Sequence, residues 1–152
     1  WIDFPREGNG WSYHYCRRQW SLADDGMLKY QYLDRFDKAM LKLLKSGRLM
    51  TKTPKSQWSG QDDKGLIYTE KDHVFAFNCH PEKSFTDYFV PVESEGVYKV
   101  TLTTDDEDFG GFNRVDTKYE YVASKQSDGR IGFMCYLPNR CATVFKRIVK
   151  KD

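Results

Sequence analysis

The chain has 152 residues and a mass of 17.9 kDa, a size that fits one compact domain or one smaller domain with an appendage. Its 24 basic and 22 acidic residues give a net charge of +2, which is too small to indicate a nucleic-acid or membrane partner. No apolar run approaches the roughly 20 residues that a membrane-spanning helix needs. The four cysteines have neither the spacing of a zinc site nor the density of a disulfide-stapled domain, so reduced, buried thiols are expected.

The first 23 residues combine aromatic, charged and small residues without the period of a helix or a strand. Proline and glycine interrupt this segment, so a long loop is predicted. Three tryptophans, Trp1, Trp11 and Trp20, stand among hydrogen-bonding side chains. Such rings suit a polar ring ligand such as a sugar, and they equally suit a loop that is pinned onto a larger body.

A helix is predicted from residue 24 or 25 to residue 46. Acidic residues stand in its first turn, Lys42 and Lys45 stand in its last turn, and Gly47 follows where a left-handed cap is expected. Apolar residues recur every three or four positions and form one stripe along the helix. This helix stripe consists of Leu33, Phe36, Met40, Leu43 and Leu44.

Residues 49–64 are polar and are broken by a proline and a glycine, so they are predicted to be a connector without a regular element. From residue 65 onward the apolar residues follow a period of two. Seven strands are predicted, at 66–70, 74–78, 85–92, 97–103, 118–122, 131–137 and 142–148. In the fourth of these the alternation places Tyr98, Val100 and Leu102 on one face. Short strands at this spacing are typical of an antiparallel sandwich or barrel.

Four longer motifs stand out: DFPR at 3–6, SYHYCRRQWSL at 12–22, NCHPEKSFTDY at 78–88 and GGFNRVD at 110–116. In this order they resemble the C-terminal part of eukaryotic 1,4-α-glucan branching enzymes, which belong to the α-amylase superfamily. The resemblance extends from Trp1 to about Arg147. It implies that the chain is part of a longer enzyme. The nucleophile, acid/base and third carboxylate of that enzyme would lie in an amylase-like (β/α)8 barrel before Trp1.

The resemblance also implies a division into three parts. Residues 1–48 would be the C-terminal end of the catalytic (β/α)8 barrel, as a loop and the last helix, residues 49–64 a connector, and residues 65–152 an all-β C-terminal domain. The expected fold class is therefore mainly β. It is an antiparallel β-sandwich preceded by a loop and one long helix from the end of the barrel.

By the same resemblance, the parent enzyme cleaves an α-1,4 link and holds the glucan segment as a covalent glycosyl-enzyme. It then transfers the segment to a 6-hydroxyl, which makes α-1,6 branches in glycogen or starch. The implied partner is α-glucan, with no nucleic acid and no membrane, and no cofactor or metal is implied. The enzyme is expected inside the cell, in the cytoplasm in preference to a plastid, and the chain alone is expected to be inactive.

Retaining glycosyl transfer uses two carboxyl groups roughly 5 Å apart. The acidic pairs of this chain are Asp24 with Asp25, Asp62 with Asp63, and the run 105–108. All stand at a helix start or in a turn, where solvated acids are favoured for local reasons. No catalytic residue is therefore expected in this chain. The acidic run does not match an EF-hand loop, and a hairpin or Ω loop is predicted there instead.

Four residues of the first segment are candidates for substrate binding: Trp1, Asp3, Arg6 and Trp11. By the resemblance they lie in the loop that leaves the eighth barrel strand, on the face where barrel enzymes place their active sites. A tryptophan ring on a glucose unit buries apolar area, while Asp3 and Arg6 can bond to hydroxyl groups. The alternative is that the rings anchor the loop.

Two other functions stay open. One alternative is that the chain is a stand-alone carbohydrate-binding β-sandwich. This hypothesis predicts that the isolated chain has affinity for soluble glucan. The other alternative is that the chain is a purely structural or interaction domain. This hypothesis predicts no affinity for glucan, and it predicts self-association through the helix stripe. Without its barrel, this stripe must find another partner or stay exposed to water.

Overall fold

The computed structural model describes residues 2–3, 6–7, 10–11, 16–51, 53, 55–60 and 62–148, and for 2–3, 6–7, 10–11 and 55–59 it describes the backbone alone. The N-terminal part contains the two-residue strands β1 (Ile2–Asp3), β2 (Arg6–Glu7), β3 (Gly10–Trp11) and β4 (Arg17–Arg18), and the helices α1 (Trp20–Asp24) and α2 (Tyr30–Gly47). The β-domain, residues 55–148, contains β5 (Lys55–Gly60), β6 (Gly65–Glu70), β7 (His73–Asn78), β8 (Phe85–Pro91), β9 (Gly96–Thr103), the 3-10 helix η2 (Glu107–Phe109), β10 (Glu120–Lys125), β11 (Ile131–Leu137) and β12 (Cys141–Ile148).

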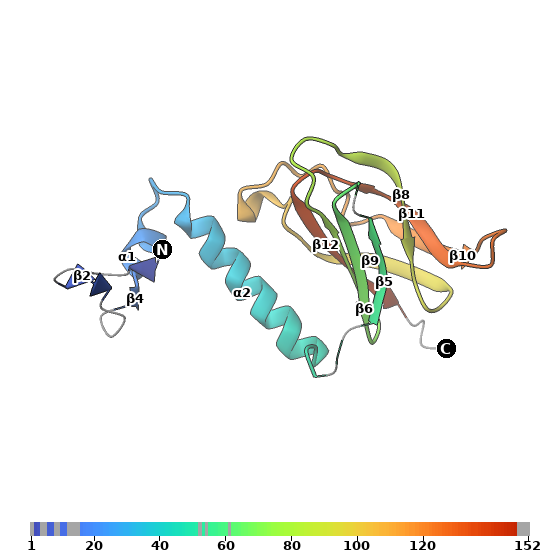
Figure 1. Cartoon of the computed structure of the whole chain (residues 1–152), viewed down its shortest axis with the longest axis horizontal. Coiled ribbons are helices and arrows are strands. Elements are labelled where there is room, and N and C mark those ends of the chain that lie inside the picture. The colour runs from blue at the N-terminus through green and yellow to red at the C-terminus, as the bar shows by residue number, and fades with distance from the viewer. Residues whose placement is uncertain are drawn as a thin grey trace.

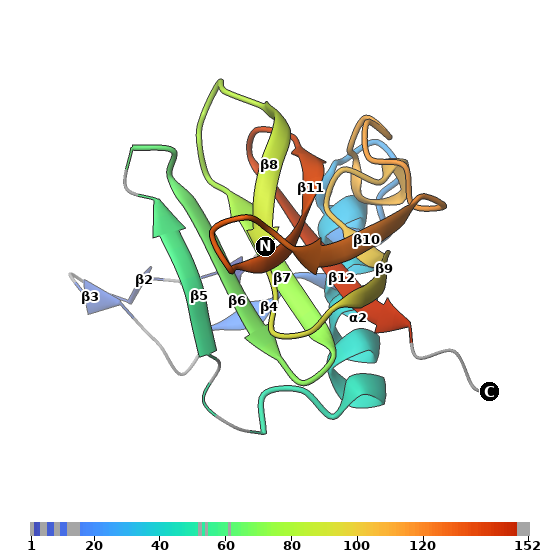
Figure 2. The same cartoon turned by 90° about the vertical axis from the view of Figure 1, so that its right-hand side faces the viewer.

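The strands of the β-domain form one antiparallel system in the order β5-β6-β7-β12-β9-β10-β11-β8. Strand β10 turns the corner of this system, because its first residues pair with β9 and its last two pair with β11. The segment β10-β11-β8 therefore folds over the face of the sheet formed by β5, β6, β7, β12 and β9 (Figure 2). The mainly β fold is confirmed, and all seven predicted strands are present.

The central strands are buried on both faces, which divides the apolar residues into two layers. Along β7, Val74 and Ala76 belong to the core between the two halves of the sandwich, whereas Phe75 and Phe77 belong to a second cluster that faces α2. The helix lies on the side of the sheet opposite to β10, β11 and β8 (Figure 1). Such two-sided burial explains the nearly continuous apolar run of β7, because a strand with one wet face alternates instead.

The predicted alternation in β9 is wrong at one residue. Tyr98 and Val100 point into the sandwich core, but Leu102 packs in the cluster that faces α2. The register between β9 and β12 shifts at this point, where Val144 pairs with Leu102 and Phe145 pairs with Val100. A β-bulge adds one residue to a strand, so the residues beyond it change faces.

The expectation that residues 49–64 contain no regular element is also wrong. Residues Lys55–Gly60 form β5, which pairs with β6 at one edge of the sheet. An edge strand has hydrogen-bond partners on one side only, and polar residues are tolerated there. Its sequence therefore lacks the apolar pattern that marks an inner strand. The division of the chain into three parts stays a prediction.

The helix predicted to start at residue 24 or 25 begins later, at Tyr30, and a separate short helix precedes it in the segment predicted as a loop. Helix α1 ends at Asp24, residues 25–29 form turns, and α2 begins at Tyr30. The carboxylate of Asp25 accepts a hydrogen bond from the backbone N–H of Met27 at 2.9 Å, so this acid stabilises a turn. At the other end the left-handed residue is Arg48 (φ 49°), because Gly47 is still helical. The turn at Arg48 allows the next residue, Leu49, to be buried.

The helix stripe lies mainly against the β-domain. Leu43 and Leu44 pack on the buried cluster of Leu49, Phe75 and Val144. Between the stripe and the sheet remains an apolar cavity of ≈ 160 Å³. Of the two outcomes expected for a stripe without a barrel, packing on another part of the chain is the one observed. Among the described residues, no helix is long and apolar enough to cross a membrane.

The hairpin between β6 and β7 holds the C-terminal end of α2. Glu70 is buried, and its carboxylate accepts hydrogen bonds from the backbone N–H groups of Met50 at 2.8 Å and Thr51 at 3.2 Å. The ammonium group of Lys71 donates to the carbonyl oxygens of Gly47 and Arg48. The Lys71 contacts satisfy carbonyl groups that a helix end leaves without partners, and the Glu70 contacts satisfy N–H groups of the segment that follows the helix. They fix the helix to the β-domain at one end.

Candidate functional site

The structure describes the candidate substrate-binding residues only in part. Trp1 lies outside the described residues, and Asp3, Arg6 and Trp11 are described by their backbone alone. Strand β2 pairs with β3, which makes Arg6 and Trp11 register partners, and β1 pairs with β4, which places Asp3 opposite Arg17. The proposed substrate role of these four residues stays a prediction.

A polar cluster in the loop between β9 and β10 was not predicted. Asp105 stands two residues after the end of β9, and its side chain is only 1% exposed. The guanidinium of Arg114 donates from Nε (2.9 Å) and Nη2 (2.6 Å) to Oδ1 of Asp105. The backbone N–H of Arg114 donates to Oδ2 of the same carboxylate at 2.5 Å. The expectation of a solvated turn acid is therefore wrong for Asp105, because its charge is compensated by an arginine nine residues further along the chain.

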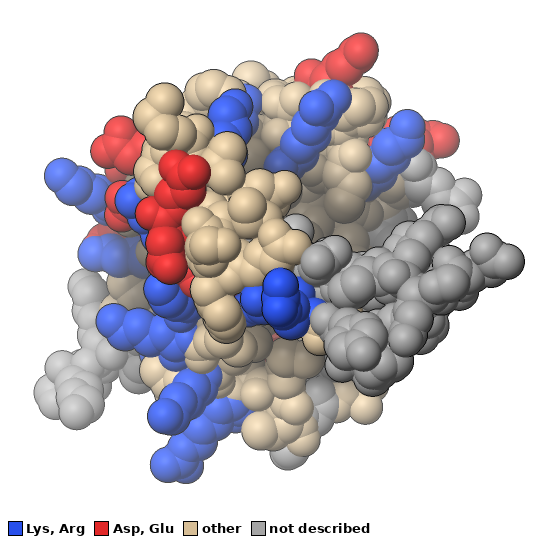
Figure 3. Space-filling view, turned by 90° about the vertical axis from the view of Figure 1, so that its left-hand side faces the viewer, with Lys and Arg blue, Asp and Glu red and all other residues tan. Residues whose placement is uncertain are grey.

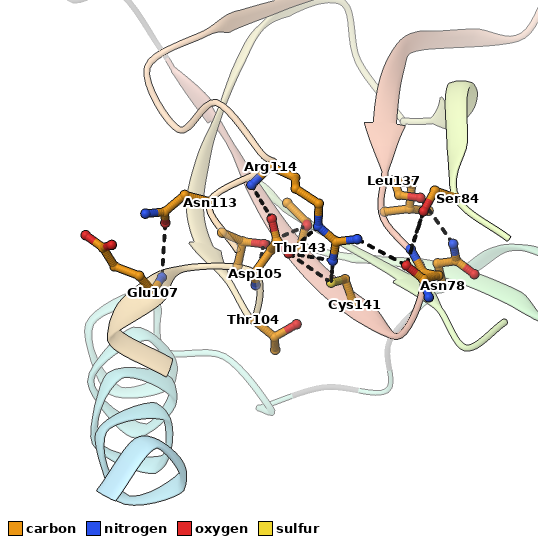
Figure 4. Close-up of polar contacts among 12 residues, drawn as sticks. Asn78, Ser84, Thr104, Asp105, Glu107, Asn113, Arg114, Leu137, Cys141 and Thr143 are labelled. Atoms are coloured by element: carbon orange, nitrogen blue, oxygen red, sulfur yellow. Dashed lines mark hydrogen bonds and ion pairs between the residues drawn. The ribbon is translucent and has the colours of Figure 1, made fainter. Parts of the chain in front are cut away.

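The cluster extends to two other turns of the β-domain (Figure 4). Nη1 of Arg114 donates to Oδ1 of Asn139 at 3.1 Å, and the backbone N–H of Asn139 donates to Oγ of Ser84 at 3.0 Å. The thiol of Cys141 lies 3.8 Å from Oδ1 of Asp105. The hydrogen bonds to Asp105 raise the pKa of Arg114, and burial raises the pKa of the Cys141 thiol. Arg114 therefore stays charged, while the thiol stays protonated at neutral pH and is no nucleophile.

The loop itself is held by short-range hydrogen bonds. The carboxylate of Asp106 accepts from the backbone N–H of Asp108 at 2.9 Å and caps η2, and Oδ1 of Asn113 accepts from the N–H of Glu107 at 3.0 Å. Gly110 has φ 79° and ends η2. At Gly111 a Cβ would lie 2.2 Å from the carbonyl of Asp105, so only glycine permits this approach. The loop is compact, as a predicted Ω loop would be, and the strands that it joins pair antiparallel.

Two hollows flank this loop. The α2 groove, of ≈ 620 Å³, lies between α2 and the loop and is lined by three rings, those of Tyr32, Phe36 and Phe109. The Phe112 pocket, of ≈ 280 Å³, lies on the other side of Gly110 and Gly111. Both hollows share Thr104, Gly110 and Gly111, so they adjoin one another.

In each acidic pair of the sequence, at least one carboxylate is engaged in a structural contact. Asp105 is bound by Arg114, and Asp63 pairs with Lys83 at 3.1 Å. Asp25 and Asp106 accept backbone hydrogen bonds in turns. Neither hollow is lined by two carboxyl groups without a fixed partner. In the part of the chain that the structure describes, no group of three or more His, Cys, Asp and Glu is placed to hold a metal ion.

The cysteines differ from one another more than the sequence indicated. All four are free thiols. Cys135 and Cys141 are buried as expected, and burial raises the pKa of Cys135 to about 12. Cys79 is exposed and Cys16 is intermediate, so the expectation of buried thiols is wrong for these two. Cys79 is the first residue after β7.

Sequence reasoning missed the Asp105 cluster and the Phe112 pocket. The available signal was the motif at 110–116, in which two glycines precede an aromatic residue and an arginine. Paired glycines in a loop indicate close approach of the backbone to another group. That signal alone does not tell which acid the arginine binds, because the partner depends on how the loop closes.

Comparison with known proteins agrees with the architecture. Residues 58–148 match the family model of the alpha amylase C-terminal all-beta domain. The chain is 44% identical over 151 residues to a 1,4-alpha-glucan-branching enzyme of Yarrowia lipolytica, covering 97% of this chain and 22% of that protein. It is 41% identical over 151 residues to that of Candida glabrata (97% and 21%) and 36% identical over 151 residues to that of Felis catus (97% and 22%).

These matches confirm the resemblance to eukaryotic branching enzymes over nearly the whole chain. The chain spans about a fifth of the length of the curated relatives it matches. The family model covers more than half of the chain, and it includes all of β6 to β12. Its antiparallel sandwich agrees with the all-β description of that model. The chain therefore belongs to the family of alpha amylase C-terminal all-β domains.

Proposed function

We propose that this chain is the C-terminal part of a 1,4-α-glucan branching enzyme. The parent enzyme transfers an α-1,4-glucan segment to a 6-hydroxyl and makes α-1,6 branches in glycogen or starch. The observation that carries the proposal is the pair of coverages: the similarity spans 97% of this chain but only 22% of a branching-enzyme relative. A chain that is matched over nearly its whole length by a small share of a relative corresponds to one part of a longer protein of that kind.

Within that enzyme, the chain has a scaffolding role. A retaining transfer needs a carboxylate nucleophile and an acid/base, and in each acidic pair of this chain at least one carboxylate is engaged in a structural contact. The chemistry is therefore assigned to the polypeptide outside this chain. The sandwich fixes the C-terminal end of α2 through Glu70 and Lys71, and α1 contacts this helix. Trp1, Asp3, Arg6 and Trp11 are proposed to contact glucan in the assembled enzyme.

The isolated chain is expected to show no branching activity, because the carboxylate nucleophile and the acid/base are proposed to lie outside it. Amylose is incubated with the purified chain, and the iodine-stain absorbance is followed over time. The expected result is no loss of stain. The positive control is a longer polypeptide from the same transcript that contains the region before Trp1, which is expected to lower the absorbance. Activity in the purified 152-residue chain would overturn the assignment of catalysis to the missing region.

The isolated chain is also proposed to self-associate through the part of the helix stripe that the β-domain leaves uncovered. Leu33 lies at the N-terminal end of the stripe and is 47% exposed. Its neighbours Phe36 and Tyr32 line the open α2 groove, so the apolar surface there is continuous. Size-exclusion chromatography with light scattering is expected to show a concentration-dependent dimer that Leu33→Glu removes. A monomer at all concentrations would refute this association.

A further inference from the structure

Phe112 is an exposed ring on a rigid support. Its side chain is 76% exposed, and the guanidinium carbon of Arg114 lies 5.2 Å from the ring centroid. That guanidinium is fixed by Asp105 and Asn139. A cation over one face of the ring stabilises its orientation. The ring is therefore held in place while most of its surface stays in contact with water.

The backbone that carries Phe112 is equally well fixed. Gly110 packs on the ring of Tyr32, since a Cβ at this position would lie 3.1 Å from the Tyr32 ring atoms. The N–H of Gly111 donates to the carbonyl of Asp106 at 2.9 Å, and the N–H of Asn113 donates to the carbonyl of Asp105 at 2.8 Å. A loop held in this way loses little conformational freedom when a ligand binds, which favours affinity.

Phe112 lies at one end of a continuous hollow surface. The Phe112 pocket adjoins the α2 groove over Gly110 and Gly111, and the groove continues along Tyr32, Phe36 and Phe109. The volume of the groove, ≈ 620 Å³, falls within the roughly 300–1,000 Å³ of small-ligand sites. The two hollows together form the Phe112 surface, which offers rings at several points along its length.

The polar groups of the Phe112 surface indicate which ligand it takes. Lys29 and Arg140 provide donors, whereas Glu107 provides acceptors and Thr104 provides both. Figure 3 shows Lys and Arg side chains over much of one face of the molecule, with Asp and Glu gathered in its upper part and uncharged surface between them. The carboxylate of Glu107 disfavours an anion, and the two cationic side chains disfavour a cation. Hydroxyl groups both donate and accept, so a neutral ligand with many hydroxyls fits this surface.

We propose that the Phe112 surface binds a segment of α-glucan, with a glucose ring stacked on Phe112 and the chain continuing toward Tyr32. The choice of α-glucan among hydroxyl-rich ligands rests on the proposed function; the site itself rests on the exposed ring and the adjoining hollows. Its lining residues are different from the four candidate residues of the N-terminal segment. The β-domain thereby has a glucan-binding site of its own.

The test uses the intact 152-residue chain at concentrations at which light scattering shows a monomer, because association through Leu33 would cover the α2 groove. It uses two ligands, maltoheptaose in calorimetric titration and glycogen in affinity gel electrophoresis. Wild-type protein is expected to bind both. Phe112→Ala is expected to raise the Kd for maltoheptaose about tenfold, because one stacked ring loses its apolar contact. The matched control is Tyr119→Ala, which truncates another exposed ring (58% exposed) that lines neither hollow, and its Kd is expected to be unchanged. The melting temperature of Phe112→Ala is expected to equal that of the wild type.

Three outcomes would overturn the proposal. The first is no binding of either ligand by the wild-type chain. The second is binding that Phe112→Ala leaves unchanged, which would assign the contact to another surface. The third is that Phe112 is protected from water in the longer polypeptide without glucan, which would make the surface an internal contact with the preceding region. Branching by that longer polypeptide is measured separately, so failure of this site does not count as failure of the proposed function.

Discussion

Replacing Arg114 by alanine is expected to lower the free energy of unfolding by about 3–5 kcal/mol, because the substitution leaves a buried carboxylate without its partner. Asp105 is 1% exposed and receives three hydrogen bonds from Arg114. Two of these come from the guanidinium and are lost in Arg114→Ala, while the backbone bond can persist. Arg114→Lys keeps the charge but not the fork of donors, so an intermediate loss is expected.

Urea denaturation followed by circular dichroism measures this loss. The matched control is Arg130→Ala. Arg130 also pairs with an aspartate at 2.7 Å, but both side chains are exposed, so little change in stability is expected. The double variant Asp105→Ala with Arg114→Ala is expected to recover part of the loss, since it removes the unpaired charge. Equal and small losses for Arg114→Ala and Arg130→Ala would show that Asp105 is not sealed from water.

The inner strands could be predicted because their burial requires a recognisable run of apolar residues in the sequence. Strand β7 reads as an apolar run since Val74 and Phe75 are buried on opposite faces, and such runs are visible without knowledge of the partner strands. Strand β5 could not be predicted in this way. It pairs with β6 alone at the edge of the sheet, and the hydrogen bonds of an edge strand place few demands on its side chains.

Features that depend on strand register or on loop closure could not be predicted from the sequence pattern. Leu102 continues the alternation of Tyr98 and Val100 in sequence, yet the bulge opposite β12 moves it into the layer that faces α2. Similarly, nothing in the acidic run distinguishes Asp105 from Asp106, although one is buried against Arg114 and the other caps η2. The choice between them follows from how the loop closes over its glycines.

The helix stripe was recognised from its spacing, but its partner was not. Leu43 and Leu44 pack on a cluster formed by β7, β12 and Leu49. The remaining cavity of ≈ 160 Å³ shows that this contact is not filled to the density of a protein interior. The spacing of such a stripe indicates only that some apolar surface covers it. Which surface this is depends on the part of the fold that lies opposite the helix.

The candidate substrate residues were proposed from aromatic content and from the resemblance together. The structure adds the backbone pairing that makes Arg6 and Trp11 opposite partners in β2 and β3. A two-stranded pairing keeps these two residues at neighbouring positions whatever the rest of the segment contacts. That proximity is required for one ring and one donor to act on the same sugar unit, so the pairing supports a test at Trp11.

Replacing Trp11 by alanine in the full-length enzyme is expected to lower kcat/KM on amylose about tenfold to a hundredfold, if the ring stacks on glucan. One stacked ring contributes apolar burial of roughly 1.5–3 kcal/mol, and loss of transition-state stabilisation of that size gives this decrease. The melting temperature is expected to stay close to that of the wild type. Trp20→Ala, the same substitution in the same segment, is the control and is expected to leave kcat/KM unchanged.

An anchoring role for Trp11 makes the opposite prediction. Deleting a buried aromatic ring costs about 3–5 kcal/mol of stability, so the melting temperature would fall while the kinetics of the protein that remains folded would be preserved. Measuring both quantities on Trp11→Ala separates the two roles, because substrate stacking acts on kcat/KM and anchoring acts on unfolding. Unchanged kcat/KM together with a large fall in melting temperature would reject the substrate role of Trp11 and make the segment before α1 a structural element of the enzyme.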